Sequence, residues 1–476
     1  MIRSKLMGFC AMLCLALSLQ AQAKAKYVFF FIGDGMGVNQ VNGTETYLAA
    51  LEGEIGTRPL CFAGFPHSAL VTTFSSSHGV TDSAAGGTAL ATGSKTHNGT
   101  LGLKSDLETE VVSLAEMAKA EGLAVGVATS VSVDHATPAA FYSHVKSRKM
   151  YHEIGLELIS AGYDFYAGSD FLEPEGADGK DLYELCGEAG YAVVRGYDAY
   201  LEQAEGADKV ILLQPEAASE VDRTCLPYAV DRGEGDLSLA DITRAGIDFL
   251  SRKSSEGFFL MVEGGKIDWA GHSNDAATLF AEVVDMDSAV RVAYDFYLEH
   301  ADETIIVISA DHETGGLVLG TGTYDLRLDV LGCQRHSAEV FSRMVAEAFG
   351  ELGEGFTWDY VRGLLRDNFG FWGDVELSDE ETAVLEGAYR DFCSGVAADR
   401  QTLYASENVI ASAARLLMAK KAHVGWQSDG HSAGYVPVFA VGVGTEAFSG
   451  RMDNTEIPGI IARLAGYGAG SGSVSR

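Results

Sequence analysis

The sequence predicts an α/β fold, a three-layer sandwich around a mostly parallel central sheet, with a helical insertion late in the chain. Apolar runs at residues 27–32, 258–262 and 304–309 lack the polar alternation of half-exposed strands. Such runs are typical of strands buried on both faces of a parallel sheet. Segments with helical periodicity separate these runs, and strands that alternate with helices indicate parallel pairing.

The elements are expected in a regular order. The first strand, 27–32, ends at Gly33 and Asp34, and ligands of open α/β sheets bind at such carboxyl ends. Residues 160–235 show no clear periodicity, so we expect an irregular segment there. The other expected elements are helices at 111–120, 237–250 and 275–299, strands at 123–129 and 436–443, and helices at 337–349 and 379–392 within the insertion.

The chain is expected to divide into a signal peptide, a core in two parts, an insertion and a tail. Arg3 and Lys5 precede an apolar run at 6–19 and an Ala21-Gln22-Ala23 cleavage site. This pattern predicts a cleavable signal peptide at 1–23 and a periplasmic or secreted protein. The run is too short to span a bilayer comfortably, so no membrane anchor is expected. The remaining ranges are 24–320 and 423–467 for the core, 321–422 for the helical insertion and 468–476 for a flexible Gly/Ser tail.

Net charge and cysteine content restrict the partners. The 476-residue chain has a formal charge of −33, which repels nucleic-acid backbones and anionic lipids, so no nucleic-acid partner is expected. Five cysteines follow the predicted signal peptide and form no CxxC pair, and their odd number leaves at least one thiol unpaired in a monomer. A Cys186–Cys225 disulfide is compatible with the sequence, but spacing alone does not decide it.

A serine stands at the predicted start of a helix of small residues. Thr81 or Asp82 can cap this helix, which places Ser83 in its first turn among free N–H groups. The positive end of the helix dipole favours an anion there. Ser83 can attack phosphorus in such a place, or it can serve only in capping.

Carboxylates and imidazoles recur at the ends of the predicted strands. Unpaired carboxylates at one sheet edge would repel one another, and divalent cations would remove this repulsion. Mixed Asp/His sets favour zinc, whereas all-oxygen sets favour magnesium. The residues concerned are Asp34, Glu263, Asp268, His272, Asp311 and His312.

Four stretches of this chain resemble the motifs of the alkaline phosphatases. They lie at 81–93, 262–272, 310–316 and 429–431, in the family's order, and together they are highly specific. The resemblance covers the core from Tyr27 to Gly316 and again from His431 onward, and the insertion falls where that family carries its variable crown region. It implies hydrolysis of phosphate monoesters to an alcohol and inorganic phosphate through a phosphoserine, at two zinc ions and one magnesium, in a homodimer.

The resemblance also implies a role for each matching residue. Ser83 would be the nucleophile, and Arg148, oriented by Asp82, would bind the phosphate. The implied metal ligands are Asp268, His272 and His431 for the first zinc, Asp34, Asp311, His312 and Ser83 for the second, and Asp34, Thr137 and Glu263 for the third ion.

The chain departs from parts of the family at two positions. His135 stands where some bacterial members carry a carboxylate, and Trp269 stands where they carry Lys or His. His135 either ligates the third ion or hydrogen-bonds to one of its ligands. An imidazole there favours zinc over magnesium, so zinc could take the third site. Trp269 is expected to pack as part of the wall.

Two other functions remain open. A phosphodiesterase or sulfatase of the same superfamily would share much of the metal site, but Ser83 with Thr137 and Glu263 favours monoester chemistry. A non-catalytic exported protein that binds metal or phosphate would need neither Ser83 nor Arg148. Turnover of a chromogenic monoester separates that protein from an enzyme.

Overall fold

The computed structural model describes residues 24–468, except residues 178, 323, 397–399, 402, 403 and 405. The predicted signal peptide lies outside the described residues, as does the predicted tail apart from Gly468. Within the described residues, every helix is too short or too polar to cross a bilayer.

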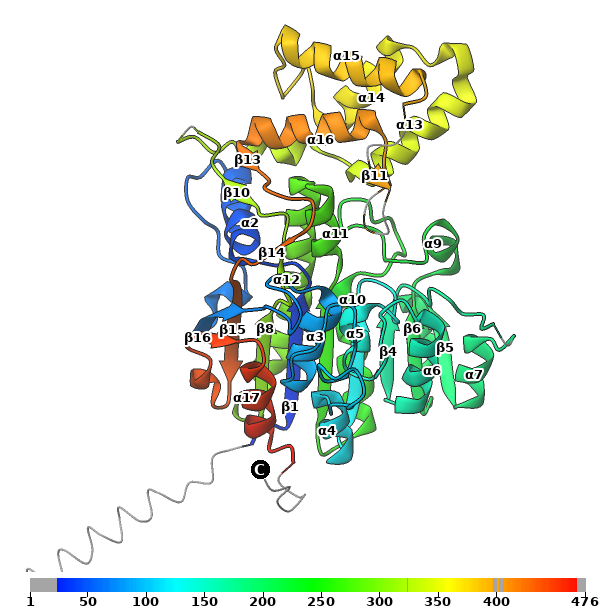
Figure 1. Ribbon diagram of the computed structural model, residues 1–476, viewed down its shortest axis with the longest axis vertical. Coiled ribbons are helices and arrows are strands. Elements are labelled where there is room, and N and C mark those ends of the chain that lie inside the picture. Colours follow the sequence, from blue (N-terminus) through cyan, green and yellow to red (C-terminus); the bar gives the residue numbers. More distant parts are fainter. Residues whose placement is uncertain are drawn as a thin grey trace, which may run out of the picture.

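A ten-stranded sheet forms the centre of the molecule (Figure 1). Its strands are β1 (Tyr27–Gly33), β2 (His67–Thr72), β3 (Ala124–Thr129), β4 (Phe165–Gly168), β5 (Tyr191–Arg195), β6 (Lys209–Leu213), β7 (Phe258–Gly264), β8 (Thr304–Ser309), β15 (Val436–Gly442) and β16 (Gly450–Asp453). Their order across the sheet is β16-β2-β15-β8-β1-β7-β3-β4-β6-β5. β15 pairs antiparallel with both β2 and β8, and the remaining neighbours pair in parallel.

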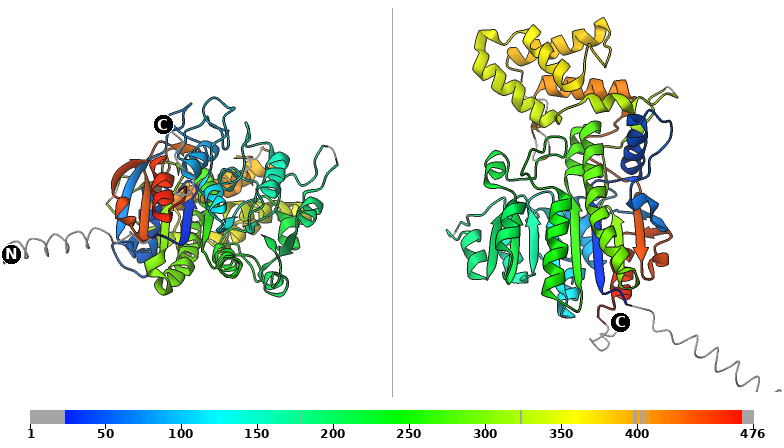
Figure 2. Two further views of the ribbon diagram at one scale, coloured as in Figure 1. Left: turned by 90° about the horizontal axis from the view of Figure 1, so that it is seen from below. Right: turned by 180° about the vertical axis from the view of Figure 1, so that it is seen from behind.

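Helices cover both faces of this sheet, which confirms the predicted α/β class. The two long helices α10 (Leu239–Lys253) and α12 (Ala276–Glu299) run along one face, seen from behind in Figure 2. α3 (Ser83–Thr92) and α17 (Glu456–Ala465) lie on the other face in Figure 1. The other core helices are α2 (Val38–Leu51), α4 (Leu114–Ala120), α5 (Ala136–Ala139), α6 (Tyr151–Ala161), α7 (Leu182–Glu188), α8 (Tyr197–Gln203), α9 (Glu216–Val221) and α11 (Lys266–Ser273).

The middle of the sheet is the most deeply buried part of the core. Every residue of β3, β7 and β8 is buried, as is β1 after Tyr27. The order β8-β1-β7-β3 is continuous and parallel, so the carboxyl ends of four neighbouring strands meet at one edge. This edge positions the acidic and imidazole side chains that the sequence places after the apolar runs.

The prediction of an irregular segment at 160–235 was wrong. This segment contains β4, β5 and β6, the far end of the sheet, together with α7, α8 and α9. Its strands have four or five residues and its helices six or seven. Elements this short do not show a recognisable hydrophobic periodicity in the sequence. Its Gly and acidic residues serve as element ends: the Asp181 side chain caps α7, and Gly196 adopts a positive φ of 84° before α8.

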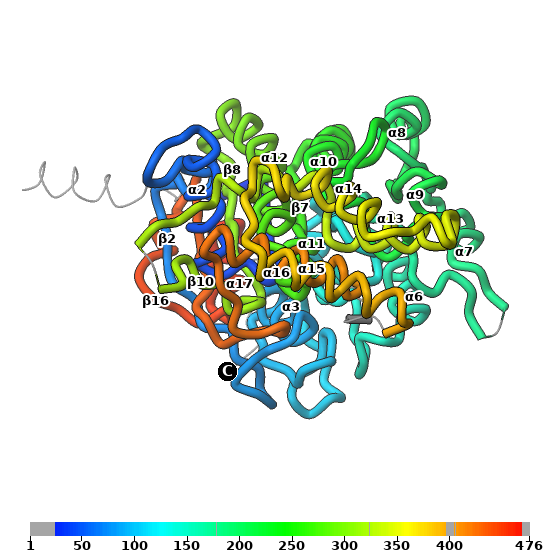
Figure 3. The backbone as a smooth tube through the Cα atoms, turned by 90° about the horizontal axis from the view of Figure 1, so that it is seen from above, coloured from blue at the N-terminus to red at the C-terminus, as the bar shows by residue number. Residues whose placement is uncertain are grey.

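Segment 321–422 is mainly helical. It contains α13 (Ala338–Leu352), α14 (Trp358–Phe369), α15 (Asp379–Cys393) and α16 (Val409–Ala422). These helices lie together at one end of the molecule, beyond the end of the sheet where α11 follows β7 (Figures 1 and 3). Its strands are the two-residue β11 (Arg400–Gln401) and β12 (Ser406–Glu407), which pair with each other.

Short elements complete the fold. The minor strands are β9 (Glu313–Thr314), β10 (Val318–Leu319), β13 (Val424–Gly425) and β14 (His431–Ser432), and the 3-10 helices are η1 (Phe62–Gly64), η2 (Ala301–Glu303), η3 (Leu328–Cys333), η4 (Gly353–Gly355) and η5 (Thr445–Ala447). All five cysteines of the described residues are free thiols, so the Cys186–Cys225 disulfide does not form.

Candidate active site

Three groups of metal-ligand side chains gather at the carboxyl edge of the sheet. Within each group, one ligand atom from every residue lies within 4.8 Å of the others. The groups are Asp268, His272 and His431; Asp34, Asp311 and His312; and Asp34, His135 and Glu263. Asp34 belongs to two of them, so the groups form one continuous cluster.

Asp268, His272 and His431 come together from a helix and a distant short strand. Asp268 and His272 are one turn apart on α11, with Asp268 Oδ2 3.3 Å from His272 Nε2. His431 lies on β14. The pairing of β14 with β9 brings this histidine next to the end of β8. The Nδ1 atoms of the two imidazoles face backbone carbonyls, at 2.6 Å from Asp429 and 2.9 Å from Thr81.

These backbone contacts leave the two Nε2 atoms facing each other at 3.2 Å, near Asp268. Carbonyl contacts of this kind commonly orient metal-binding histidines. Burial alone would raise the pKa of Asp268, but the neighbouring imidazoles hold it well below its usual value.

Asp34, Asp311 and His312 form the most buried group. Their side chains are fully buried, and His312 Nε2 lies 3.5 Å from Asp34 Oδ1 and 3.2 Å from Asp311 Oδ2. Burial, followed by repulsion from neighbouring carboxylates, raises the pKa of both aspartates well above the usual value.

Glu263, His135 and Thr137 surround the other side of Asp34. The Thr137 hydroxyl donates to Asp34 Oδ2 at 3.4 Å, and the Thr129 hydroxyl donates to Glu263 Oε2. His135 Nδ1 lies 3.9 Å from Glu263 Oε1. Burial lowers the pKa of His135 to about 3, so this imidazole is neutral.

Ser83 is the first residue of α3 and is buried at the edge of this cluster. Asp82 caps the helix by accepting a hydrogen bond from the Ala85 N–H at 3.1 Å. Ser83 Oγ lies 3.3 Å from His312 Nε2. The small residues of α3 permit this approach, since a Cβ on Gly86 would lie 3.0 Å from the Asp311 backbone oxygen.

Arg148 lies between Asp82 and His135. Its Nη1 donates to Asp82 Oδ2 at 3.2 Å, and its Nη2 lies 3.1 Å from His135 Nε2. Asp82 Oδ2 also accepts from the Gly99 N–H at 2.9 Å, so one carboxylate links the helix cap to the guanidinium. This is the cation that the sequence predicted beside the acidic cluster.

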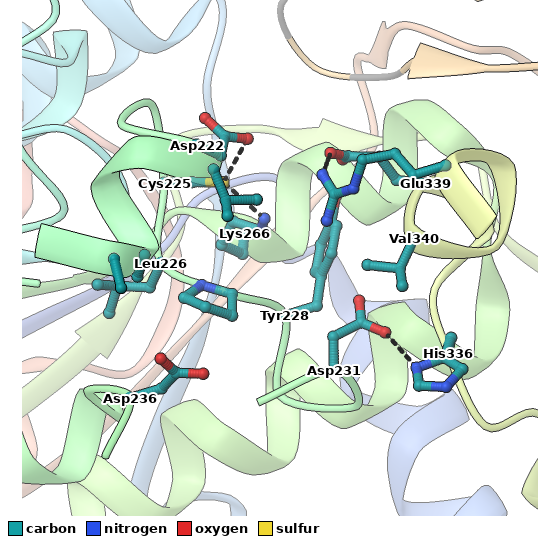
Figure 4. Close-up of a pocket in the computed structure, with 15 residues that line it drawn as sticks. Asp222, Cys225, Leu226, Tyr228, Asp231, Asp236, Lys266, His336, Glu339 and Val340 are labelled. Atoms are coloured by element: carbon teal, nitrogen blue, oxygen red, sulfur yellow. Dashed lines mark hydrogen bonds and ion pairs between the residues drawn. The ribbon is translucent and has the colours of Figure 1, made fainter. Parts of the chain in front are cut away.

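Trp269 and Lys266 leave the same helix in different directions. The Trp269 ring is buried against His135, with centroids 6.2 Å apart. Lys266 points into a separate cavity of about 370 Å³, where its Nζ lies 2.9 Å from Cys225 Sγ and 3.3 Å from the Tyr228 ring centroid (Figure 4). Lys266 therefore contributes no donor to the acidic cluster.

The residues of all three groups were candidate ligands in the sequence analysis, but Tyr404 and Thr129 were not candidate site residues. Tyr404 stacks on His272, with centroids 4.9 Å apart. It precedes α16 within the insertion, where no strand end marks it as a site residue. Thr129 ends β3, and its place beside Glu263 depends on the pairing of β3 with β7.

The buried acids fit metal ions. Asp34 Oδ1, Asp311 Oδ2 and Glu263 Oε1 are buried and accept no hydrogen bond among the described residues. Buried carboxylate oxygens without partners are costly, and such groups usually pair or coordinate metals. The orphaned oxygens lie within the three groups, so the donor set suits divalent cations.

Comparisons with known proteins agree with this site. The family model described as alkaline phosphatase matches residues 25–164 and 167–467. "Alkaline phosphatase 3" of Bacillus subtilis strain 168 is 31% identical over 384 residues, covering 79% of this chain and 75% of the relative. The alkaline phosphatase of Escherichia coli K12 is 32% identical over 337 residues, covering 61% of this chain and 71% of the relative.

Solved structures extend the likeness to nearly the whole chain. The cold-active alkaline phosphatase of a psychrophilic Shewanella species matches with a TM-score of 0.78 at 28% identity, covering 92% of this chain and 99% of that one. The Thermus thermophilus alkaline phosphatase matches with a TM-score of 0.77 at 28% identity, covering 94% of each chain.

Proposed function

This chain belongs to the alkaline phosphatase family and is a phosphatase, and we propose that it hydrolyses phosphate monoesters through a phosphoserine at Ser83. In the first step Ser83 loses its hydroxyl proton to solvent as the Oγ–phosphorus bond forms. The ester P–O bond breaks, and the leaving oxygen takes up a proton and departs as the alcohol. In the second step water cleaves the phosphoserine and releases inorganic phosphate.

The placement of Ser83 carries this proposal. Its Oγ is buried at the N-terminus of a ten-residue helix and lies 3.3 Å from His312 Nε2. N–H groups of a helix start bind phosphate, and the dipole favours negative charge there. A serine with no catalytic task would not need a cluster of orphaned carboxylates beside it.

We assign two zinc ions and one magnesium to the three side-chain groups. Asp268, His272 and His431 would hold the first zinc. Asp34, Asp311, His312 and Ser83 would hold the second, and Asp34, Thr137 and Glu263 would hold the magnesium. When bound, such ions lower the pKa of coordinated oxygens and stabilise charge on the attacking and leaving groups.

Arg148 binds the phosphoryl group, with Asp82 as its support. A guanidinium presents paired N–H donors that match two phosphoryl oxygens. Burial lowers the pKa of Arg148, but Tyr404, Asp82 and Asp34 outweigh this effect and raise it, so the group keeps its charge. In a chain of net charge −33, this local cation offsets the long-range repulsion of anions.

The third ion is magnesium, with zinc as its competitor. Thr137, Glu263 and Asp34 supply oxygen ligands, which suit magnesium, whereas His135 supplies nitrogen, which suits zinc. A structure of the enzyme from the Antarctic bacterium TAB5 has an Asp in place of a His and Mg bound in its M3 site. That structure supports the idea that a carboxylate in place of an imidazole favours magnesium.

Neither alternative function is favoured. Monoester chemistry is supported by relatives named alkaline phosphatase rather than phosphodiesterase or sulfatase. A protein that only stores metal or binds phosphate would have no use for Ser83 in contact with His312.

A burst experiment tests the proposal. Wild-type protein should release p-nitrophenol from p-nitrophenyl phosphate with a burst that reflects phosphoserine formation, whereas bis(p-nitrophenyl) phosphate and p-nitrophenyl sulfate should be much poorer substrates. Ser83→Ala should keep its zinc, by elemental analysis, and lose the burst. Ser160→Ala, which changes an exposed serine on α6, is the matched control. A full burst in Ser83→Ala would remove Ser83 as the nucleophile.

The remaining expectations complete the proposal. Residues 1–23 act as a signal peptide, and the mature chain works in the periplasm or outside the cell. Its core comprises 24–320 and 423–467, and its helical insertion 321–422 forms a crown. The protein functions as a homodimer on phosphomonoesters, and nucleic acid is not among its partners.

A further inference from the structure

Segment 321–422 contributes an aromatic side chain to the surroundings of the three candidate metal-ligand groups. Tyr404 belongs to the connection between β11 and β12, and β11 lies between α13–α16 and the core in Figure 1. The Tyr404 ring stacks on the imidazole of His272, with centroids 4.9 Å apart and planes inclined by 12°. A near-parallel contact of this kind covers one face of the imidazole.

The Tyr404 ring also packs against Trp269 and His135. Its centroid lies 5.5 Å from that of Trp269 at an interplanar angle of 68°, and 6.5 Å from that of His135 at 86°. Edge-to-face contacts at these separations are favourable. Tyr404 is therefore held by the core residues that it covers, and its position is set by this packing.

Tyr404 also has an electrostatic effect on Arg148, the proposed phosphate-binding cation. Among the charged or polar neighbours that raise the pKa of Arg148, Tyr404 contributes the largest effect. In turn burial raises the pKa of Tyr404 to about 12, while Arg148 acts to lower it. The ring face lies on His272, and Tyr404 and Arg148 affect each other electrostatically.

In the proposed reaction, these contacts would put Tyr404 on the leaving-group side. Ser83 adjoins His312, so the attacking oxygen lies beside the group of Asp34, Asp311 and His312. In an in-line displacement the leaving oxygen departs on the opposite side of phosphorus. The group with two histidines, Asp268, His272 and His431, is the one that we assign to that side.

We propose that Tyr404 is a positioning residue of this active site, whose ring holds the His272 imidazole in the orientation that binds the first zinc. The inference rests on the proposed function, since it assigns a metal to Asp268, His272 and His431. It makes the helical segment part of the catalytic site, although that segment supplies none of the assigned metal ligands.

The backbone contact of His272 explains why a stacked ring is needed. The Asp429 carbonyl, 2.6 Å from Nδ1, and Asp268 Oδ2, 3.3 Å from Nε2, contact the two edges of the imidazole. Tyr404 adds a contact from the ring face, which neither of these edge contacts covers. Outer partners of metal-binding histidines typically change metal affinity by about 10- to 100-fold, and we expect Tyr404 to lie at the low end because stacking is less directional than a hydrogen bond.

Metal retention by ring variants tests this role. Tyr404→Phe keeps the ring, whereas Tyr404→Leu and Tyr404→Met remove it. Zinc per chain is measured during titration with a chelator, and kcat and KM are measured with p-nitrophenyl phosphate. The two ringless variants should release one zinc at about tenfold lower free chelator, with lower kcat, and Tyr404→Phe should retain zinc as the wild type does. Tyr360→Leu, at an exposed aromatic residue on α14, is the control.

Each outcome decides the proposal. Wild-type retention in both ringless variants would overturn it, and so would a Tyr404→Phe variant that loses zinc as readily as they do. Wild-type protein that holds no zinc or hydrolyses no monoester would instead overturn the proposed function. Zinc binding and turnover in wild type, with unchanged retention in the variants, would refute the role of Tyr404 alone.

Discussion

The two ring nitrogens of His135 have different neighbours, and this difference bears on its role. Nε2 lies 3.1 Å from Arg148 Nη2, and a guanidinium is always a donor. Nε2 must therefore accept, which leaves the proton of the neutral imidazole on Nδ1, the atom that faces Glu263. A protonated nitrogen cannot bind a metal ion. For Nδ1 to bind the third ion, its proton would have to move to Nε2, and Nε2 could then no longer accept the hydrogen bond from Arg148.

At this position His135→Asp should tighten magnesium binding. The change adds a carboxylate beside Glu263 and Asp34, and hard cations prefer oxygen ligands. In chelator-treated, zinc-reloaded protein, activation should need about tenfold less magnesium than in wild type, by analogy with other changes next to metal ligands. His300→Asp is the matched control, because His300 packs on Tyr27 at the opposite edge of the sheet. Superimposable magnesium curves would contradict any influence of His135 on this ion.

At the scale of elements, a buried ion pair ties α16 to the short strand before it. Arg415 Nε lies 2.6 Å from Glu407 Oε2, and the two side chains are 1% and 0% exposed. Arg415→Met should destabilise the protein by about 3–5 kcal/mol, because it leaves Glu407 buried without its partner. Thermal unfolding measures this loss.

An exposed ion pair of the same helix, α16, should contribute much less stability than the buried pair. Lys420 is 70% exposed where it meets Glu381, so Lys420→Met should cost only about 0–1 kcal/mol. The double variant Arg415→Met, Glu407→Leu should recover most of the lost stability, since it removes both buried charges. An Arg415→Met protein that melts with the wild type would show that the pair contributes nothing.

Elements with strong local patterns were predictable, whereas those defined by pairing were not. The continuous apolar residues of β1, β7 and β8 identified these strands. Asp34 directly follows β1, and Asp311 and His312 follow β8 after Ala310. The antiparallel direction of β15 has no local signature, because direction depends on where the connection crosses the sheet. The contact of Tyr404 with His272 also has no local signature in the sequence, because it depends on how segment 321–422 packs on the core.

At the scale of the whole molecule, the acidic cluster joins parts of the chain that are distant in sequence. Asp34 follows β1, Asp311 lies just after β8 and Glu263 is the penultimate residue of β7, so the sheet order holds three carboxylates together. Burial raises the pKa of all three. Their mutual repulsion opposes the pairing of the central strands, and bound cations would convert it into attraction.

Removing the metals should therefore destabilise the entire core. A ligand that binds only the folded chain adds about 2.7 kcal/mol of stability per site at a hundredfold excess over its Kd. Chelator treatment should lower the midpoint of thermal unfolding, and zinc followed by magnesium should restore it. Asp34→Asn is the informative variant, because Asp34 belongs to two groups and its loss should reduce the metal-dependent shift most strongly. Equal unfolding midpoints with and without chelator, in protein shown to bind zinc, would mean that the ions do not stabilise the fold.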